Sequence, residues 1–230
     1  TLWVGTQNKG LAKIIPNQDK NSHKIQFYTQ FGINSQLDQF QINRLCIDPN
    51  NNIWIGTNGN GLFMLPFAES KKEPGVAHFQ CLKSDVNDLF SFSGNNYISA
   101  LFVDKGNNLW VGSSLLNVAN IGNNGLLRYN TREIDDNNVV NFWVRSIAGD
   151  NNGMLWLGTT DGIKRIDLTK PHNNMQKIVS NVAYKVNGKN LQANTVMALK
   201  SNFNGYFLVG TDGAGIVLYP QNEMYKPKPS

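Results

Sequence analysis

The stretch Asn52-Ile53-Trp54-Ile55-Gly56-Thr57-Asn58-Gly59-Asn60-Gly61-Leu62-Phe63 decides the fold of this 230-residue chain, because its central word recurs along the sequence. The word consists of an aliphatic or aromatic residue, Trp, an aliphatic residue, Gly, and Thr or Ser. Its Trp slot falls at positions 3, 54, 110, 156 and 208, and only Leu208 departs from Trp. The period of 46 to 56 residues is close to that of β-propeller blades.

Each copy of the word sits in the same order of short apolar segments and turns. An alternating segment comes first, followed by an Asp/Asn turn, the Trp segment, a Gly-rich turn and a segment that opens with a Gly-aliphatic pair. Alternation with period two predicts strands rather than helices, and Asp, Asn and Gly suit tight turns. We expect first strands over Ile42–Ile47, Ile98–Val103, Val144–Ala148 and Val196–Leu199.

A weaker segment, such as Lys24–Thr29 or Val76–Leu82, completes each unit as an outer fourth strand. The sequence therefore predicts an all-β β-propeller of about five four-stranded antiparallel blades. The units are approximately 1–40, 41–96, 97–142, 143–193 and 194–230, with the first and last incomplete. These two units repeat the same middle strands instead of completing each other. We therefore expect a piece of a larger propeller, or a propeller whose other blades lie outside this sequence.

The third unit departs from this pattern. If its Gly-aliphatic pair is Gly125-Leu126, the turn before it, Ser114 to Asn124, is much longer than in the other units. Only 14 residues then separate Tyr129 from Val144, which leaves little room for a full fourth strand.

Composition excludes several classes of function. The net charge is +5, but the 21 Lys and Arg are scattered, so we expect no nucleic-acid binding. The two cysteines lack CxxC spacing, and Cys46 is expected to be a buried free thiol. The chain contains no apolar run of about 18 residues, and the lack of a signal peptide leaves its compartment open.

No catalytic or metal site is expected. The three histidines fall in different units, at His23, His78 and His172. Asp135 and Asp136 are sequence neighbours, whereas a glycosidase pair must face each other across the sugar. The run Asp48-x-Asn50-x-Asn52 lacks the Gly and Glu of a calcium loop and suits a hairpin turn. We therefore predict a chain without cofactors and without enzymatic activity.

Residues 52–63, together with Ser93-Gly94-Asn95-Asn96-Tyr97-Ile98-Ser99-Ala100-Leu101, resemble the two-component regulator propeller repeat. The resemblance implies the periplasmic or extracellular sensor region of a bacterial hybrid two-component system. It also implies that the larger propeller is of the seven-bladed type. The partners that it implies lie outside this sequence: further propeller blades and a membrane-linked histidine kinase or diguanylate cyclase. A homodimer is one arrangement that could transmit the signal.

The two sets of connections that lead into first strands and out of Trp strands lie on one face of a propeller. We expect a carbohydrate or similar polar ligand there, because aromatic rings suit the apolar faces of sugars and amides suit their hydroxyls. Arg44 and Arg145 are expected near the channel, where they could meet an acidic ligand. The other candidate residues are Asn95, Asn96, Tyr97, Phe142, Trp143 and Asn194, with the turn Ser114 to Asn124 nearby.

Three alternatives remain open from the sequence. These side chains could serve only loop packing. The same face could hold another protein, which a stable complex formed without any small molecule would favour. A propeller lyase or hydrolase would need clustered His, Glu or Asp at the channel mouth, and the sequence does not predict such a cluster.

Overall fold

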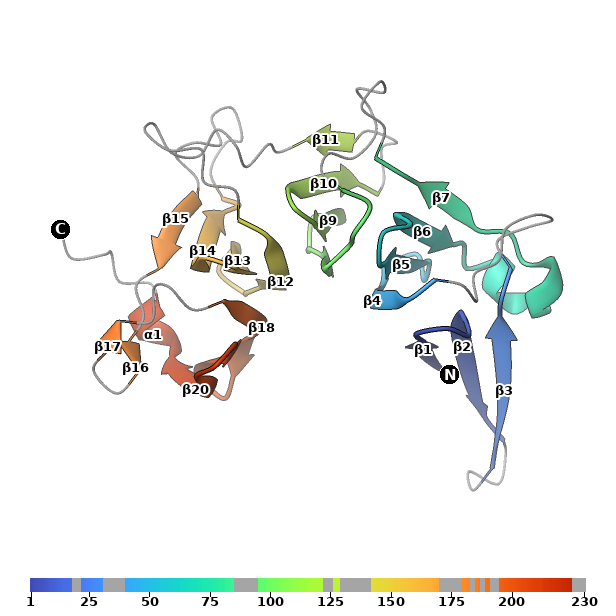
Figure 1. The fold of residues 1–230 in the computed structure, drawn as a ribbon, viewed down its shortest axis with the longest axis horizontal. Helices are drawn as coiled ribbons and strands as arrows, with labels where there is room; N and C mark the ends of the chain where they lie inside the picture. Colours follow the sequence, from blue (N-terminus) through green and yellow to red (C-terminus); the bar gives the residue numbers. More distant parts are fainter. Residues whose placement is uncertain are drawn as a thin grey trace.

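The computed structural model describes residues 1–17, 22–30, 40–84, 95–121, 126–128, 142–169, 179–182, 185–186, 189–190 and 195–224. In this part of the chain, five antiparallel sheets of three or four strands follow one another in sequence order. They are arranged as an open arc around a common axis (Figure 1). The predicted all-β propeller architecture is confirmed at this level.

Each sheet is built from strands that are consecutive in the chain. The first contains β1 (Leu2–Gly5), β2 (Leu11–Pro16) and β3 (His23–Tyr28). The second contains β4 (Ile42–Ile47), β5 (Ile53–Thr57), β6 (Leu62–Leu65) and β7 (Gln80–Leu82), with 3-10 turns at Glu69–Lys71 and Pro74–Val76. The third contains β8 (Ala100–Val103), β9 (Asn108–Gly112), β10 (Leu116–Asn120) and β11 (Leu126–Arg128).

The fourth sheet contains β12 (Val144–Gly149), β13 (Met154–Thr159), β14 (Gly162–Asp167) and β15 (Val179–Val182). The fifth contains β18 (Val196–Phe203), β19 (Tyr206–Thr211) and β20 (Gly215–Pro220), followed by the short helix α1 (Gln221–Met224). A separate hairpin pairs β16 (Lys185–Val186) with β17 (Lys189–Asn190). No helix in the described ranges is long and apolar enough to cross a membrane.

The third sheet corrects the expected strand assignment. Its third strand starts at Leu116, which pairs with Gly112, so the turn between β9 and β10 is short rather than long. Ser113 donates from its Oγ to the Leu115 carbonyl at 2.9 Å, as Thr57 does to Gly61 in the second sheet at 2.7 Å. Leu126 instead begins the outer strand β11, and the sheet has four strands. A non-glycine residue closes this turn, so the Gly marker was misleading.

The core consists of apolar clusters at the seams between successive sheets. Each repeat Trp packs toward the following sheet: Trp54 lies with Ile98 and Val111, and Trp156 with Phe207. The rings of Trp156 and Phe207 have centroids 4.7 Å apart. Filling these seams with large rings is the predicted role of the Trp slot, because aromatic side chains bury the most apolar area per residue.

The Trp side chain also closes the preceding turn, which the sequence interpretation missed. Asp48 accepts from the Trp54 Nε1 at 3.0 Å through one oxygen, and from the amides of Asn50 and Asn52 at 2.9 Å through the other. The Asp104–Trp110 and Asp150–Trp156 pairs repeat this bond at 2.8 and 2.7 Å. In the fifth unit Asn202 stands where the other units have this Asp, and Leu208 stands where they have Trp. The indole donor and its carboxylate acceptor are therefore both missing from that unit.

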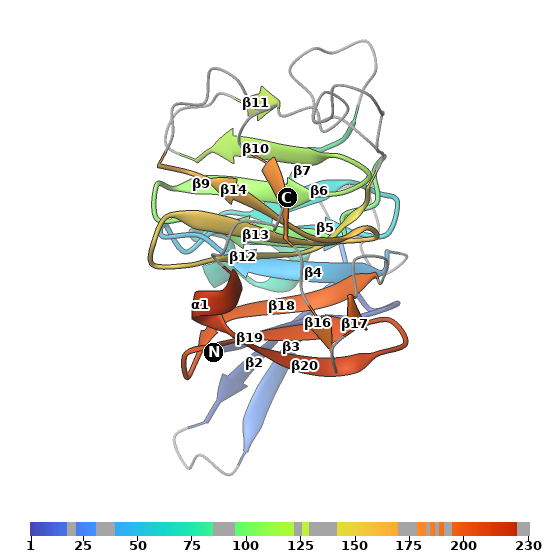
Figure 2. The same cartoon turned by 90° about the vertical axis from the view of Figure 1, so that its left-hand side faces the viewer.

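The arc ends in two sheet faces that expose apolar side chains. Ile216 is 74% exposed, whereas Leu62, which holds the same slot in the second sheet, is 4% exposed. Leu2 is 60% exposed, whereas its counterpart Ile53 is 2% exposed. The first and last sheets remain separate three-stranded sheets, as the strand order predicts. In Figure 2 the strands are seen from the side, with their turns gathered at the two ends.

Candidate functional site

The lead-in segments of β8 and β12 are each fixed to a turn on the same face of the arc. The Trp143 amide donates to the Thr160 Oγ1, and the Thr160 amide donates to the Trp143 carbonyl, both at 3.1 Å. Tyr97 forms an isolated antiparallel bridge with Asn58, in the turn after β5. Backbone pairing therefore holds Tyr97 and Trp143 at the ends of adjacent blades, where the predicted binding face lies.

Tyr97, Trp143 and Arg145 form one cluster across the seam between the third and fourth sheets. The Tyr97 and Trp143 ring centroids are 5.7 Å apart at an interplanar angle of 55°. The Arg145 guanidinium carbon lies 5.5 Å from the Trp143 ring centroid, a cation–π distance. All three residues are half-buried, so part of each side chain faces solvent. Three of the predicted residues are therefore brought together.

Phe142, which the sequence placed in the ligand site, is instead a core residue. It is 1% exposed and belongs to the cluster between the third and fourth sheets, so it offers no surface to a ligand. Alternation explains the difference, because neighbours in an extended segment point to opposite sides.

A buried lysine beside this site was missed by the sequence interpretation. Lys164 is 4% exposed, and its Nζ lies 4.6 Å from the Phe142 ring centroid and 2.9 Å from the Asp161 Oδ2. Asp161 belongs to the same turn as Thr160, which holds Trp143. Lys164 occupies the slot that Phe63 holds in the second sheet, so a charged residue at an apolar repeat position was the available signal.

The remaining candidate residues are not part of this cluster. Asn96 serves structure, since its carbonyl accepts from the Gly61 amide and its Oδ1 accepts from the Ser84 amide. Asn95 is exposed, and its amide donates to the Ser114 Oγ. Arg44 is exposed on β4 and donates to the Asn43 carbonyl at 2.8 Å. Asn194 lies outside the described residues.

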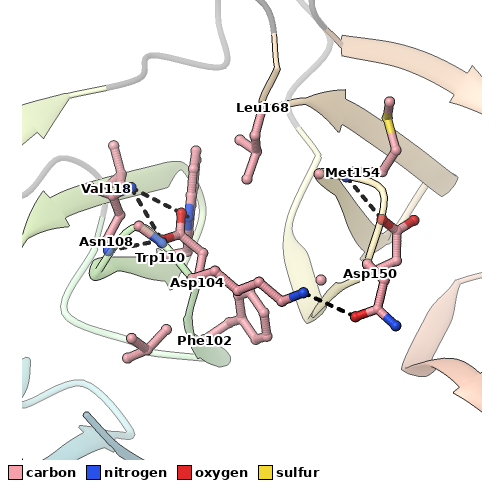
Figure 3. A pocket seen from close by; sticks show the side chains of 14 residues that line it. Phe102, Asp104, Asn108, Trp110, Val118, Asp150, Met154 and Leu168 are labelled. Carbon is pink, nitrogen blue, oxygen red and sulfur yellow. Dashed lines mark hydrogen bonds between the residues drawn. The ribbon is translucent and has the colours of Figure 1, made fainter. Parts of the chain in front are cut away.

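A hollow lies at the other end of the seam between the third and fourth sheets, away from the Tyr97–Trp143–Arg145 cluster. It has a volume of about 500 Å³ and an apolar lining that includes Trp110, Val118 and Leu168 (Figure 3). Its carboxylates, Asp104 and Asp150, already accept hydrogen bonds from their own turns. The Lys105 Nζ donates to the Asn151 Oδ1 at 3.1 Å, which links the two turns. This hollow was not predicted, and we assign it to the packing of the seam.

Neither of these two sites contains a set of groups suited to catalysis. No cluster of three or more His, Cys, Asp or Glu side chains able to hold a metal occurs within the described ranges. The two described cysteines are Cys46, which is partly rather than fully buried, and Cys81, which is exposed. The Tyr97–Trp143–Arg145 cluster offers aromatic surface and a cation, which are means of binding rather than of bond cleavage.

Comparison with known proteins supports the repeat assignment. A family model described as two component regulator propeller matches residues 36–59 and 91–114, which carry β4–β5 and β8–β9. No curated protein sequence is significantly similar to the chain.

Several solved structures share the fold. One is the extracellular domain of a protein from B. thetaiotaomicron assigned as a hybrid two-component system (19% identity, TM-score 0.67, 96% of this chain, 27% of that one). A second, from the same organism, is the extracellular domain of a protein assigned as a one-component system (20%, 0.63, 94% and 25%). A third is PorZ of Porphyromonas gingivalis, a surface component of the type-IX secretion system (14%, 0.61, 96% and 31%).

At these identities the likeness concerns the fold, and the chain spans about a quarter to a third of the length of these proteins. Each matched segment contains an Asp turn bonded to its repeat Trp, through Asp48–Trp54 and Asp104–Trp110. The chain thus has a propeller-type fold, and two of its repeats match the two component regulator propeller model.

Proposed function

We propose that this chain is the ligand-binding propeller of an extracytoplasmic bacterial sensor, and that it binds a carbohydrate or similar polar ligand on its loop-rich face. The observation that carries the proposal is the cluster of Tyr97, Trp143 and Arg145. A sensor location outside the cytoplasm agrees with the neighbouring folds, two of which are extracellular domains of proteins assigned as signalling systems.

The cluster has the chemistry that a sugar requires. The C–H faces of a pyranose ring are apolar and pack on aromatic rings, while its hydroxyls need donors and acceptors at the edge. Tyr97 and Trp143 supply two rings tilted toward each other, and the Tyr97 hydroxyl and the Arg145 guanidinium supply polar edges. The cluster spans a seam between blades, so a ligand bound there would also bear on how the third and fourth sheets pack.

The exposed apolar faces at the two ends of the arc support partners beyond this chain. Slots that are buried in the second sheet are open at Leu2 and Ile216. We propose that further blades cover these faces and complete a larger ring, of seven-bladed type, linked to a membrane-bound kinase or cyclase. A change in blade packing, or in the packing of two copies, would pass the signal on.

Calorimetric titration of the chain with a panel of oligosaccharides tests the function. We expect one class to bind, and Trp143→Ala to weaken that binding at least tenfold, since stacking on the ring is lost. Phe203→Ala is the matched control, because Phe203 is an exposed aromatic next to the opposite turn, between β18 and β19. Saccharide binding that survives Trp143→Ala unchanged would place the site elsewhere, and no binding to any saccharide would contradict the proposal.

A further inference from the structure

The first strand of each sheet from the second to the fifth lies nearest the centre of the arc (Figure 1). The residue that follows Ile42, Ile98, Val144 or Val196 holds an equivalent position at the start of these inner strands. In three sheets it is an extra residue in the pairing with the Trp strand, because the register shifts between Ile42 and Arg44, Val144 and Ser146, and Val196 and Ala198. The bulged residues are Asn43, Arg145 and Met197, and the sequence equivalent in the third sheet is Ser99. A bulge re-aims the side chain that it carries.

In two of the blades this residue bonds the next blade. The Asn43 Nδ2 donates to the Ile98 carbonyl at 3.2 Å, and the Ser99 Oγ donates to the Val144 carbonyl. Ile98 and Val144 hold equivalent positions in successive inner strands. The slot is therefore a structural one in the second and third blades, where a short polar side chain links neighbours around the channel.

Arg145 breaks this pattern. Among the described residues its guanidinium makes no hydrogen bond to the next blade, and its Nε is buried without an acceptor. The side chain instead lies over Trp143, 5.5 Å from the ring centroid. A cation–π contact does not replace a hydrogen bond to a buried N–H, and leaving such a donor unpaired is costly. The fourth blade thus gives up a structural link and points a cation at the ligand site.

The charges around Arg145 leave its cation uncompensated. The nearby turn contains one carboxylate, Asp161, which pairs with the buried Lys164 at 2.9 Å. No ion pair joins Arg145 to any Asp or Glu in the described ranges. A guanidinium presents parallel N–H donors that match the paired oxygens of a carboxylate or a sulfate.

We infer that Arg145 binds an acidic group of the ligand, a carboxylate or a sulfate on the saccharide that packs against Tyr97 and Trp143. This inference rests on the proposed function and narrows its ligand class to acidic saccharides. The rings would hold the sugar face, while the accessible part of the guanidinium would bind the oxyanion. Met197, in the same slot of the fifth blade, has no such chemistry.

Matched pairs of ligands test the inference. We would titrate oligogalacturonate against its methyl ester, and a sulfated glycosaminoglycan oligosaccharide against its desulfated form. The acidic member of one pair should bind at least tenfold more tightly, and Arg145→Met should abolish that difference. Arg145→Lys should retain part of the difference in affinity, because lysine keeps the positive charge but lacks the parallel N–H donors of the guanidinium. Lys24→Met, which removes an exposed charge on the outer strand β3, should leave the difference unchanged.

The possible results distinguish a failure of this inference from a failure of the proposed saccharide-binding function. If neutral and acidic saccharides bind alike and Arg145→Met has no effect, the acidic-group inference is overturned while the saccharide site stands. If no saccharide binds, the proposed function fails, and inorganic sulfate then decides the anion site. Sulfate should change Trp143 fluorescence, measured as the difference from Trp143→Phe, relative to chloride at equal ionic strength. The fluorescence response to sulfate should vanish in the Arg145→Met variant, whose circular dichroism spectrum should match that of the unaltered chain. If the unaltered chain shows no response to sulfate, the anion site is overturned as well.

Discussion

At the scale of single residues, one carboxylate in each complete Trp-containing repeat fixes both a turn and an aromatic ring. Asp104 accepts from the amides of Gly106 and Asn108 through one oxygen and from the Trp110 Nε1 through the other. The turn conformation and the seam packing of Trp110 therefore depend on the same side chain. An amide could not accept at both of its side-chain positions, which explains Asp in this slot wherever Trp follows.

Asp104→Ala is expected to lower the free energy of unfolding by about 2–4 kcal/mol, because the Trp110 N–H is then buried without an acceptor. Urea denaturation followed by circular dichroism measures the loss. Asp212→Ala is the matched control, since Asp212 is exposed in a turn of the fifth sheet, and it should change stability by about 0.5 kcal/mol or less. Equal effects of the two substitutions would show that the Asp–Trp bond has no special role.

The two cysteines should differ in reactivity. Burial raises the pKa of the Cys46 thiol, and the nearby Asp48 carboxylate adds to the rise, against hydrogen bonds with the backbone of Val103 and Ile47 that lower it. Burial also raises the pKa of Cys81, although Lys83 opposes the shift and the residue is exposed. Both groups are therefore mainly protonated at neutral pH, and the reactive thiolate increases about tenfold per pH unit below the pKa.

Alkylation by iodoacetamide should label Cys81 before Cys46, and both rates should increase from pH 7 to pH 9. Mass spectrometry of peptides sampled over time gives the order. In Cys81→Ser only the slow site should remain. Labelling of Cys46 first would mean that β4 is more accessible than its packing against the third sheet indicates.

At the scale of elements, the packing of β8 against β12 depends on side chains of complementary size. Phe102 and Gly149 face each other, and a Cβ on Gly149 would lie 2.5 Å from the Phe102 Cζ. In the preceding seam the equivalent slots hold Cys46 and Val103. In each seam a larger residue on one blade thus faces a smaller residue on its neighbour. The recurring sequence motif does not specify which of the two blades carries the larger residue.

Gly149→Ala should lower the free energy of unfolding by about 1–3 kcal/mol, because the Phe102 ring or the inner strand must shift. Phe102→Leu in the same chain should recover part of the loss by making room. Gly75→Ala is the control, since nothing lies within 4 Å of a Cβ there. Thermal unfolding of Gly149→Ala, Phe102→Leu, the double variant and Gly75→Ala measures the coupling; additive effects of the two seam substitutions would contradict the fit.

The third sheet shows how far a local marker can mislead about an element. Leu116 and Val118 alternate directly after the Trp strand, and this alternation was the signal for the third strand. The Gly-aliphatic pair Gly125-Leu126 predicts a later start for this strand, because such a pair marks the third strand in the other units. Strand pairing decides between the two readings, since β10 can then lie between β9 and β11.

At the scale of the whole molecule, the end faces of the arc carry the residues that pack blade on blade elsewhere. Leu62→Ser should lower the free energy of unfolding by about 3 kcal/mol or more, because a large side chain is lost from a filled seam. Ile216→Ser, in the same slot of the fifth sheet, should cost about 0.5 kcal/mol or less in the isolated chain. Urea denaturation compares them, and equal losses would mean that the Ile216 face is already covered.

The same exposed face should affect association. Ile216→Lys together with Leu218→Lys should reduce self-association of the isolated chain, because exposed apolar patches on an edge strand favour pairing. Analytical ultracentrifugation over a range of concentrations measures this. Lys24→Ala, on the outer strand β3, is a surface control that should leave the association unchanged. Association that survives the double substitution would assign it to another surface.

The sequence by itself determined the repeat, the strand order, the Trp seams and the failure of the two terminal units to merge, because these depend on local alternation and on turn residues that recur every blade. It also placed Tyr97, Trp143 and Arg145 on one face, since the topology of a blade fixes where each connection emerges. Only the tertiary structure decided that Phe142 points into the core, that Lys164 lies against its ring and that Arg145 packs over Trp143 instead of bonding the next blade. Those facts depend on which way a side chain points across a seam between segments that are far apart in the sequence, such as Tyr97 and Trp143 or Phe102 and Gly149, and on the size of the side chain that it meets there. Periodicity within one blade contains no information about its neighbour.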